Sequence, residues 1–392
     1  MRSGRMKKNI DEITCTKVIC EKKGRTEKAR EKNVCVEKAC TKNDFAEKVC
    51  AKGFSAKTGV FKRIFAKGIV KRTAAAVMAL ALCLPLCCCK GQDKKTENTI
   101  FAMDTYMTFT VYGKNSADVS EKCRQEIQRL DALLSPDGEN SELNKINQSE
   151  QIELSDEMAY IIKSSIELSK ATDGAFDITV GALTELWGFS GDKEYYLPSG
   201  DEINTALKTV GYEKLSLEGN ILKKPIDTKI DVGAIAKGYA TDRLFEILEK
   251  EQPVGAVISL GGNVLTFGKN PSGKAWSVAV TDPDDRNGCV KMLYSVGKQA
   301  FVTSGNYQRY FEQNGQKYHH ILDPKTGYPA DTGLRSVTIA CQSGLYADAL
   351  STAVFAAGAD RAAEFSKKTV SFDAVYVTDK NEVIEQSCNA GN

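Results

Sequence analysis

Residues 107–134, MTFTVYGKNSADVSEKCRQEIQRLDALL, join two periodic patterns through a short polar connection. Residues 107–112 alternate apolar and polar side chains, and this period of two predicts a β-strand with one buried face. Residues 116–134 place apolar side chains at intervals of three and four, which predicts an amphipathic helix. The stretch therefore predicts a strand that leads directly into a long helix.

Strands and helices follow this stretch without a repeating β-α-β unit. Ser155, with Asp156 and Glu157 after it, has the pattern of a helix N-cap and predicts a helix to about Lys170. Other patterns predict helices over residues 201–210, 235–250 and 347–357, and strands over 256–260, 276–281, 299–303, 336–340 and 373–378. This irregular order favours an α+β fold over a doubly wound parallel sheet.

Charge is unevenly distributed along the 392 residues, although the net charge is only +2. Residues 1–72 hold 21 Lys and Arg against 8 Asp and Glu, whereas the rest of the chain holds 32 against 43. The uncharged run 73–86 lies where the two parts meet. At ~1.5 Å per helical residue this run is too short to cross a hydrocarbon core of ~30 Å. After the basic pair Lys71-Arg72 it has the pattern of a signal peptide.

Three consecutive cysteines, Cys87 to Cys89, end this run and resemble a bacterial lipobox, in which a cysteine is lipidated and becomes the mature N-terminus. Cys89 fits best because Leu86 stands three positions before it, and Cys88 is the alternative. We therefore predict a signal peptide and lipobox over residues 73–89 and a polar tether over residues 90–98. The protein is expected to be lipid-anchored on the extracytoplasmic face of the cell membrane. A short membrane-anchoring helix is the other interpretation.

The basic leader, residues 1–72, has cysteine pairs at C-x4-C spacing but no histidine, which does not fit a zinc site. A nucleic-acid-binding tail does not suit a segment ahead of an export signal, so no nucleic-acid partner is expected. We interpret the leader as a start placed too far upstream, or as a disordered segment lost on processing. Residues 99–388 are predicted to form one domain whose few scattered cysteines make no disulfide framework.

Two kinds of segment in this domain have the residue types of ligand loops. Residues 231–238, DVGAIAKG, lead into a predicted helix, so free N–H groups, the helix dipole and Lys237 converge where a phosphate would fit. Taken alone, this pattern is also that of an ordinary turn. Residues 259–263 and 303–306 each follow a predicted strand with glycines that allow a ligand to approach the backbone.

The only two histidines of the chain, His319 and His320, precede an Asp-Pro-x-Thr-Gly turn.

The segment Ala347-Asp-Ala-Leu-Ser-Thr352 combines a carboxylate with hydroxyl groups. Asp348 and Thr352 are four residues apart and therefore lie on one helical face, with Ser351 beside them. Such hard oxygen ligands suit Mg²⁺. An acidic residue on a solvated face is the alternative, but the apolar neighbours of Asp348 argue against it.

Seven short segments in this order resemble the FAD:protein FMN transferase family, also called ApbE, from about Thr99 to Glu385. They are Met103-Asp-Thr-Tyr-Met-Thr108, Gly174-Ala-Phe-Asp-Ile178, Asp231-Val-Gly-Ala-Ile-Ala-Lys-Gly238, Ser259-Leu-Gly-Gly-Asn263, Thr303-Ser-Gly-Asn306, His320-Ile-Leu-Asp-Pro-Lys-Thr-Gly327 and Ala347-Asp-Ala-Leu-Ser-Thr352. The resemblance implies an α+β fold of mixed, mainly antiparallel sheets flanked by helices, with FAD in a central cleft.

The resemblance also implies a Mg²⁺-dependent flavin transferase. Such an enzyme cleaves FAD, attaches FMN through a phosphoester to a Thr or Ser of an acceptor redox protein with an Asp-Gly-x-Thr-Gly-like motif, and releases AMP. By similarity, His320 is the base, since imidazole titrates near neutrality, and Mg²⁺ is held by Ala234, Asp348, Ser351 and Thr352. The residues implied to contact FAD are Met103, Ala175, Phe176, Asp177, Asp231, Lys237, Gly261, Gly262, Asn263 and Leu322.

The loop after the first helix departs from the family pattern, because residues 134–143 lack the aromatic residue that often stacks on the cofactor there. Three alternatives to a transferase remain open from the sequence. One is a Mg²⁺-dependent FAD pyrophosphatase that passes FMN to water. The others are a flavin-binding lipoprotein without turnover and a membrane-tethered scaffold.

Overall fold

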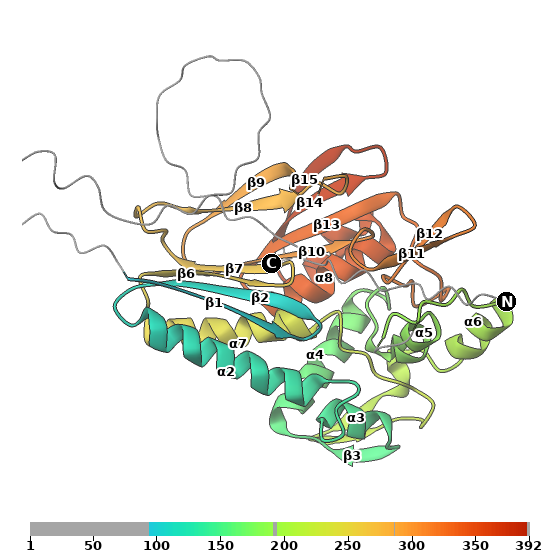
Figure 1. Ribbon diagram of the computed structural model, residues 1–392. Helices are drawn as coiled ribbons and strands as arrows, with labels where there is room; N and C mark the ends of the chain where they lie inside the picture. Colours follow the sequence, from blue (N-terminus) through green and yellow to red (C-terminus); the bar gives the residue numbers. More distant parts are fainter. Residues whose placement is uncertain (1–93, 191–193, 286, 390–392) are drawn as a thin grey trace, which may run out of the picture. The chain divides into compact units, whose positions relative to one another are not determined.

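The computed structural model describes residues 94–190, 194–285 and 287–389 (Figure 1). The basic leader, the predicted signal peptide and Cys89 lie outside these residues. Among the described residues, no helix combines the length and apolar character needed to cross a membrane. Their four cysteines, Cys123, Cys289, Cys341 and Cys388, are all free.

An eight-stranded sheet with the order β1-β2-β6-β7-β10-β13-β14-β15 is the framework of the described domain. Its strands are β1 Lys95–Ala102, β2 Thr105–Tyr112, β6 Gly255–Leu260, β7 Asn263–Gly268, β10 Gln299–Gly305, β13 Leu334–Cys341, β14 Phe372–Thr378 and β15 Val383–Cys388. All neighbouring strands pair antiparallel. In β2 the alternation predicted from the sequence buries Met107, Phe109 and Val111 on one face. The α+β class with mainly antiparallel sheets is confirmed.

Three long helices cover one face of this sheet (Figure 1). The helices of the domain are α2 Ser116–Leu134, α3 Glu142–Asn147, α4 Asp156–Ala171, α5 Gly181–Leu186, α6 Gly200–Leu207, α7 Ala236–Glu251, α8 Gly344–Ala357 and α9 Ala362–Lys368. α2 packs on β1 and β2, α7 on β7, and α8 on β10 and β13. The apolar stripe of α2 is buried as predicted, from Val119 to Leu134.

The opposite face of the sheet is covered by a two-stranded ribbon, β8 Trp276–Thr281 with β9 Cys289–Ser295. Trp276 and Val278 pack there against Val257 and Phe301, whereas the next residue of β6, Ile258, belongs to the core under the helices. Two smaller sheets complete the domain: the hairpin β11 Tyr310–Gln313 with β12 Gln316–His319, and β3 Gln151–Glu153, β5 Ile221–Lys223 and β4 Ser216–Glu218.

Three boundaries predicted from the sequence are wrong by three residues or more. The helix predicted from residue 347 begins at Gly344. Lys95 begins β1 and pairs with Tyr112, so the predicted tether over residues 90–98 already contains sheet. Most outward side chains of β1 are polar and exposed, because it is an edge strand, and this gives it the composition of a linker. The helix predicted over residues 201–210 ends at Leu207 and is followed by tighter turns, in which Thr209 N bonds Ala206 O at 3.0 Å.

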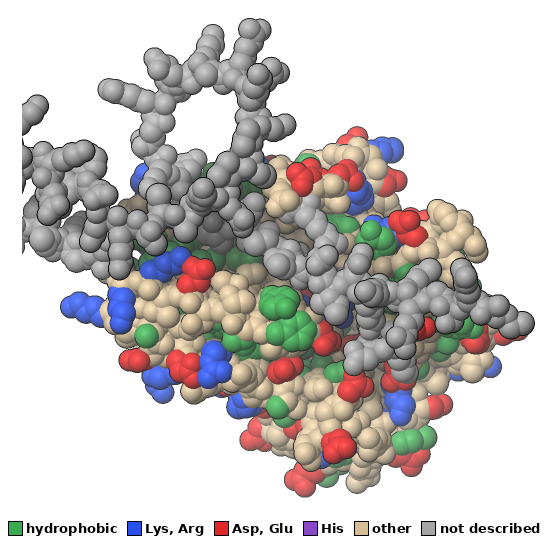
Figure 2. Space-filling model, viewed as in Figure 1, with side chains coloured by type: hydrophobic (Ala, Val, Ile, Leu, Met, Phe, Trp, Pro, Cys, Tyr) green, Lys and Arg blue, Asp and Glu red, His purple; other side chains and the backbone are tan. Residues whose placement is uncertain are grey.

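One end of the β1–β2 hairpin carries a hydrophobic patch among mixed charges (Figure 2). Phe101 and Tyr106 are the exposed aromatic residues there, with their rings 5.2 Å apart. The turn between them, Met103-Asp104, has positive φ at both positions, 48° and 58°. This is the backbone of a two-residue hairpin turn whose twist matches that of the strands. The turn directs Met103 and Asp104 toward the cavity described next.

Candidate active site

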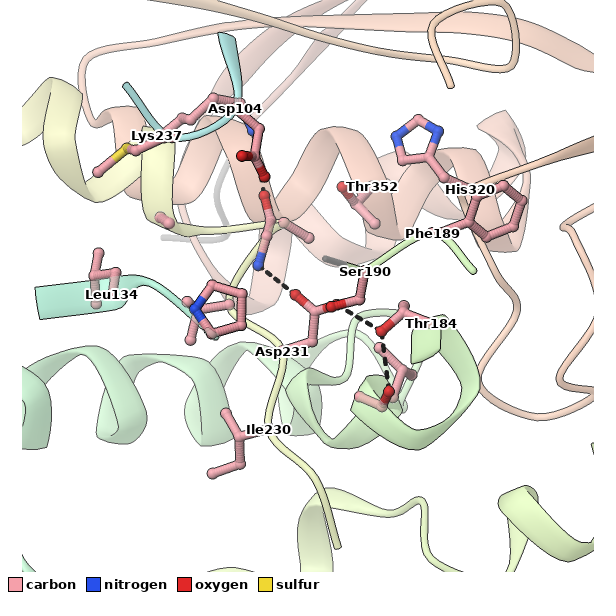
Figure 3. Close-up of a pocket in the computed structure, with 18 of the residues that line it drawn as sticks. Asp104, Leu134, Thr184, Phe189, Ser190, Ile230, Asp231, Lys237, His320 and Thr352 are labelled. Atoms are coloured by element: carbon pink, nitrogen blue, oxygen red, sulfur yellow. Dashed lines mark hydrogen bonds between the residues drawn. The ribbon is translucent and has the colours of Figure 1, made fainter. Parts of the chain in front are cut away.

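A cavity of about 770 Å³ lies where the N-terminus of α7, the first turns of α8 and the turns of two hairpins meet (Figure 3). This volume is in the range of cofactor sites, roughly 300–1,000 Å³. The predicted site residues that line it are Met103, Ala175, Phe176, Asp177, Asp231, Ala234, Lys237, Gly261, Asn263, His320, Leu322, Asp348 and Thr352. Gly262 and Ser351 do not line it. Segments far apart in the sequence therefore meet around one space.

A close contact between α7 and α8 sets the position of Asp348. A Cβ added to Gly238 would lie 2.4 Å from the carbonyl oxygen of Gly344 and 2.5 Å from Cβ of Asp348. The missing side chain lets the Gly238 N–H donate to Asp348 Oδ2 at 2.7 Å. The carboxylate thereby caps the first turn of α7 from the neighbouring helix.

Asp242, one turn further along α7, caps α8 in return. Its carboxylate accepts hydrogen bonds from Ser343 Oγ at 2.8 Å, Gly344 N at 2.6 Å and Leu345 N at 3.1 Å. Each helix thus supplies the carboxylate that satisfies free N–H groups at the start of the other. This reciprocal arrangement fixes both the register and the separation of the two helices.

Polar side chains surround the buried end of the cavity. Asp348 is buried, and burial raises the pKa of its carboxyl group, an effect that the charge of Lys237 opposes. Thr352 lies one turn later on the same face and also lines the cavity, as predicted. Asn263 is buried and lines the same end of the cavity, where its side-chain amide also opposes the rise in the pKa of Asp348. A carboxylate, an amide and a hydroxyl therefore share one wall that can bind a polar ligand.

Ser351, the fourth predicted metal ligand, points elsewhere. Its hydroxyl is buried, donates to the main-chain oxygen of Asp348 at 2.9 Å and lies 2.8 Å from Ser304 Oγ. Ser351 therefore ties α8 to β10 instead of lining the cavity. The i+3 spacing in the sequence placed it near Asp348, but its own helix and the sheet take up its hydrogen-bonding capacity.

The predicted phosphate loop does lead into the N-terminus of α7. Asp231 Oδ1 accepts from Gly233 N at 2.7 Å, and Thr184 Oγ1 donates to Asp231 Oδ2 at 2.7 Å (Figure 3). Lys237 Nζ lies 3.3 Å from the carbonyl oxygen of Gly233. The loop is thus held by Asp231, and the amino group of Lys237 stays at the cavity together with the first turn of α7.

Asp177 lines the cavity but has both oxygens occupied. Oδ1 accepts from the N–H and the hydroxyl of Thr179 at 2.8 Å and 2.7 Å, and Oδ2 accepts from Tyr212 N at 2.8 Å. Burial raises the pKa of this carboxyl group, and the hydrogen bonds oppose the rise. Asp177 therefore organises the wall to which its neighbours Ala175 and Phe176 belong.

The two histidines have different environments. His319 ends β12, is buried against Phe355 and places Nε2 3.1 Å from Ala330 O, which fits the structural role expected for it. His320 lines the cavity, and its Nδ1 lies 3.1 Å from Arg309 O. Because a carbonyl oxygen only accepts, Nδ1 carries the proton and Nε2 is left with a free lone pair. His320 is thus in the tautomer that a base requires.

His320 lies at the cavity, in surroundings that differ from those of a free imidazole. Burial, with the nearby charge of Arg309, lowers the pKa of His320 to about 3, so this imidazole does not titrate near neutrality. It is neutral throughout the physiological range and stays able to accept a proton.

Several residues of the cavity escaped the sequence analysis. Thr184 holds Asp231, Asp131 Oδ1 accepts from Met103 N at 2.9 Å, and Arg309 lies beside His320. A short motif marks neither Thr184 nor Asp131, since each acts through a partner more than 25 positions away. Arg309 stands three residues after the Thr303–Asn306 segment. Its closeness to this predicted ligand loop is the one feature of the sequence that could have indicated it.

Comparisons with known proteins agree with this geometry. Residues 103–376 match the model of the ApbE family. The chain is similar to the FAD:protein FMN transferase of Haemophilus influenzae, with 30% identity over 82% of this chain and 97% of that protein, and to that of Escherichia coli K12, with 32% identity over 76% and 90%.

Solved structures show the same similarity. The crystal structure of the ApbE protein from Thermotoga maritima is 35% identical and covers 75% of this chain and 97% of its own, with a TM-score of 0.70. The flavin transferase ApbE from Vibrio cholerae is 26% identical and covers 76% of this chain and 97% of its own, with a TM-score of 0.66.

Proposed function

The chain belongs to the ApbE family, and on this premise we propose that it transfers FMN from FAD to a Thr or Ser hydroxyl of an acceptor protein and releases AMP. The observation that carries the proposal is the position of His320, whose free Nε2 shares one cavity with Asp348, Thr352 and the N-terminus of α7. A base, a set of hard oxygen ligands and a phosphate-binding helix end are the components that such a transfer needs.

We propose Mg²⁺ as the metal of this site. The donors fit, because Asp348, Thr352 and the main chain at Ala234 offer oxygen atoms to the same cavity. A carboxylate, a hydroxyl and a main-chain oxygen form the kind of donor set that suits a hard cation, which keeps several waters. When bound, Mg²⁺ supplies charge neutralisation for the pyrophosphate.

The residues of the chain then have separate tasks. The N–H groups of α7 and the amino group of Lys237 bind phosphate oxygens. His320 Nε2 accepts the proton of the acceptor hydroxyl while the hydroxyl oxygen forms a bond to the flavin-side phosphorus. The bond from that phosphorus to the bridging oxygen breaks, and AMP leaves with this oxygen. Phosphate charges close to an imidazole favour its protonated form, which would help His320 to hold the proton.

We also propose that the transferase works at the outer surface of the cell membrane. The signal-peptide pattern over residues 73–86 and the cysteine at position 89 support a lipid anchor there. The proposed acceptor is a redox protein on the same side of the membrane, with an Asp-Gly-x-Thr-Gly-like segment that includes the modified hydroxyl.

The full-length protein, incubated with FAD, Mg²⁺ and a candidate acceptor, tests the proposal. We expect FMN bound covalently to the acceptor and AMP in equal amount. Free FMN with no labelled acceptor would identify a pyrophosphatase, and intact FAD would identify a binding protein. His320→Asn is expected to abolish transfer and to retain FAD. Tyr318→Phe is the matched control, because it removes only a hydroxyl bonded to Gln316 at the surface.

A further inference from the structure

Arg309 differs from the other arginines of the domain. The structure describes six of them, and five pair with a carboxylate: Arg124 with Glu121, Arg129 with Glu126, Arg243 with Glu246, Arg335 with Asp284 and Arg361 with Asp173. Within the described residues, Arg309 has no acidic partner, although it is partly buried. A partly buried arginine that lines a cavity and has no carboxylate partner among the described residues is available to a ligand that supplies the anion.

Arg309 is fixed next to the proposed base. Its carbonyl oxygen accepts hydrogen bonds from both the main-chain N–H of His320, at 3.0 Å, and Nδ1 of the same residue, at 3.1 Å. Both residues line the cavity, and the charge of Arg309 is felt at the His320 imidazole. The two residues therefore face the same part of the bound ligand.

Two lysines also line the cavity, but each acts mainly on other groups. Lys229 Nζ donates to Asn147 O at 2.6 Å. Lys237 stands in the first turn of α7, and its charge acts on Asp348 and, less than that of Arg309, on His320. Lys237 and the oxygen ligands of α8 thus share one place, where opposite charges already balance in part. Of these three cations, Arg309 is the one whose charge acts most on His320, beside which the phosphoryl group is placed.

We propose that Arg309 binds the phosphoryl group that is transferred, which is the flavin-side phosphate of FAD. This inference rests on the proposed function, because the acceptor oxygen must contact both His320 Nε2 and the phosphorus that it attacks. The phosphorus therefore lies near His320, and hence near Arg309. A planar guanidinium offers paired donors that match two oxygens of this group as its bonds change.

Binding of flavins to the full-length protein with Mg²⁺ present tests the assignment without an acceptor. FMN and riboflavin differ only in the phosphate, and flavin fluorescence reports both. We expect Arg309→Gln to weaken FMN binding about tenfold and riboflavin binding less than twofold, since one charge-assisted contact is lost. Arg335→Gln is the matched control, because that arginine pairs with Asp284 at the surface, and it leaves both affinities unchanged.

Transfer kinetics add a second measurement. We expect Arg309→Gln to lower kcat at least about 100-fold with little change in the KM for the acceptor. Arg309→Lys keeps the charge without the paired donors, so we expect an intermediate kcat. If Arg309→Gln does not fold, Arg309→Lys is used in its place.

Equal weakening of FMN and riboflavin, a loss confined to AMP binding, or a raised acceptor KM at unchanged kcat would each overturn the assignment. If the wild type bound FMN through Arg309 but modified no acceptor, only the proposed function would fail.

Discussion

Replacing Gly238 with alanine tests whether the contact between α7 and α8 positions Asp348. The added Cβ would lie 2.4 Å from Gly344 O and 2.5 Å from Cβ of Asp348, whereas ordinary contact begins at 3.4 Å. The helices must therefore separate by about 1 Å, at a cost of roughly 1–3 kcal/mol for overpacking. Loss of the Gly238 N–H bond to the carboxylate adds about 1.5–3 kcal/mol. The higher helix propensity of alanine returns about 1 kcal/mol.

The net loss of unfolding free energy is about 2 kcal/mol or more, which lowers the melting temperature by at least about 4 °C in a domain of this size. Thermal unfolding followed by circular dichroism measures this change. Mg²⁺ should also bind more weakly. In a Mg²⁺ titration of FAD cleavage, the concentration that gives half of the maximal rate should therefore be higher. Gly200→Ala is the control, because its Cβ would meet only Tyr328 Oη at 3.8 Å in the first turn of α6. A Gly238→Ala protein as stable as Gly200→Ala, with unchanged Mg²⁺ dependence, would refute the reasoning.

Three further predictions concern the two histidines and the Asp231 loop. Because the pKa of His320 in the free protein is about 3, kcat/KM for FAD should stay level from pH 8 to about pH 5, and an acid limb near pH 6.5 would contradict this. Burial lowers the pKa of His319 to about 4, so the unfolded chain binds more protons than the folded one between pH 4 and 6.5. The unfolding free energy should therefore fall as the pH drops through this window, and denaturant titrations should find a shallower fall in His319→Gln. Thr184→Val removes the hydroxyl that holds Asp231, and initial rates should show the KM for FAD raised about five- to tenfold with kcat nearly unchanged; an unchanged KM would separate this loop from FAD binding.

The sequence predicted those elements whose side chains repeat with a clear period. Helix α2 has the bounds expected for it, and β8 matches residues 276–281, because each buries one regular face. Strands β1 and β11 were not predicted, since most of their outward side chains are polar or exposed. β1 is a strand because it pairs with β2. This pairing cannot be recognised from the side-chain pattern of β1 alone.

The sequence predicted the site residues that lie together in one short motif. Asp348 and Thr352 share a helical face as their spacing required, and both line the cavity. Ser351 does not line the cavity, because its hydroxyl is engaged by Ser304 on β10. The low pKa of His320 comes from burial and from Arg309, and neither can be derived from the local sequence. Tertiary packing thus determined the chemistry of residues that the sequence had only located.

The most direct test of the proposed function is the mass of a candidate acceptor co-expressed with this protein. The account predicts that intact-protein mass spectrometry finds one added FMN, that peptide mapping places it on a Thr or Ser, and that His320→Asn removes it. An acceptor of unchanged mass beside an active, FAD-consuming wild-type enzyme would contradict the transferase assignment.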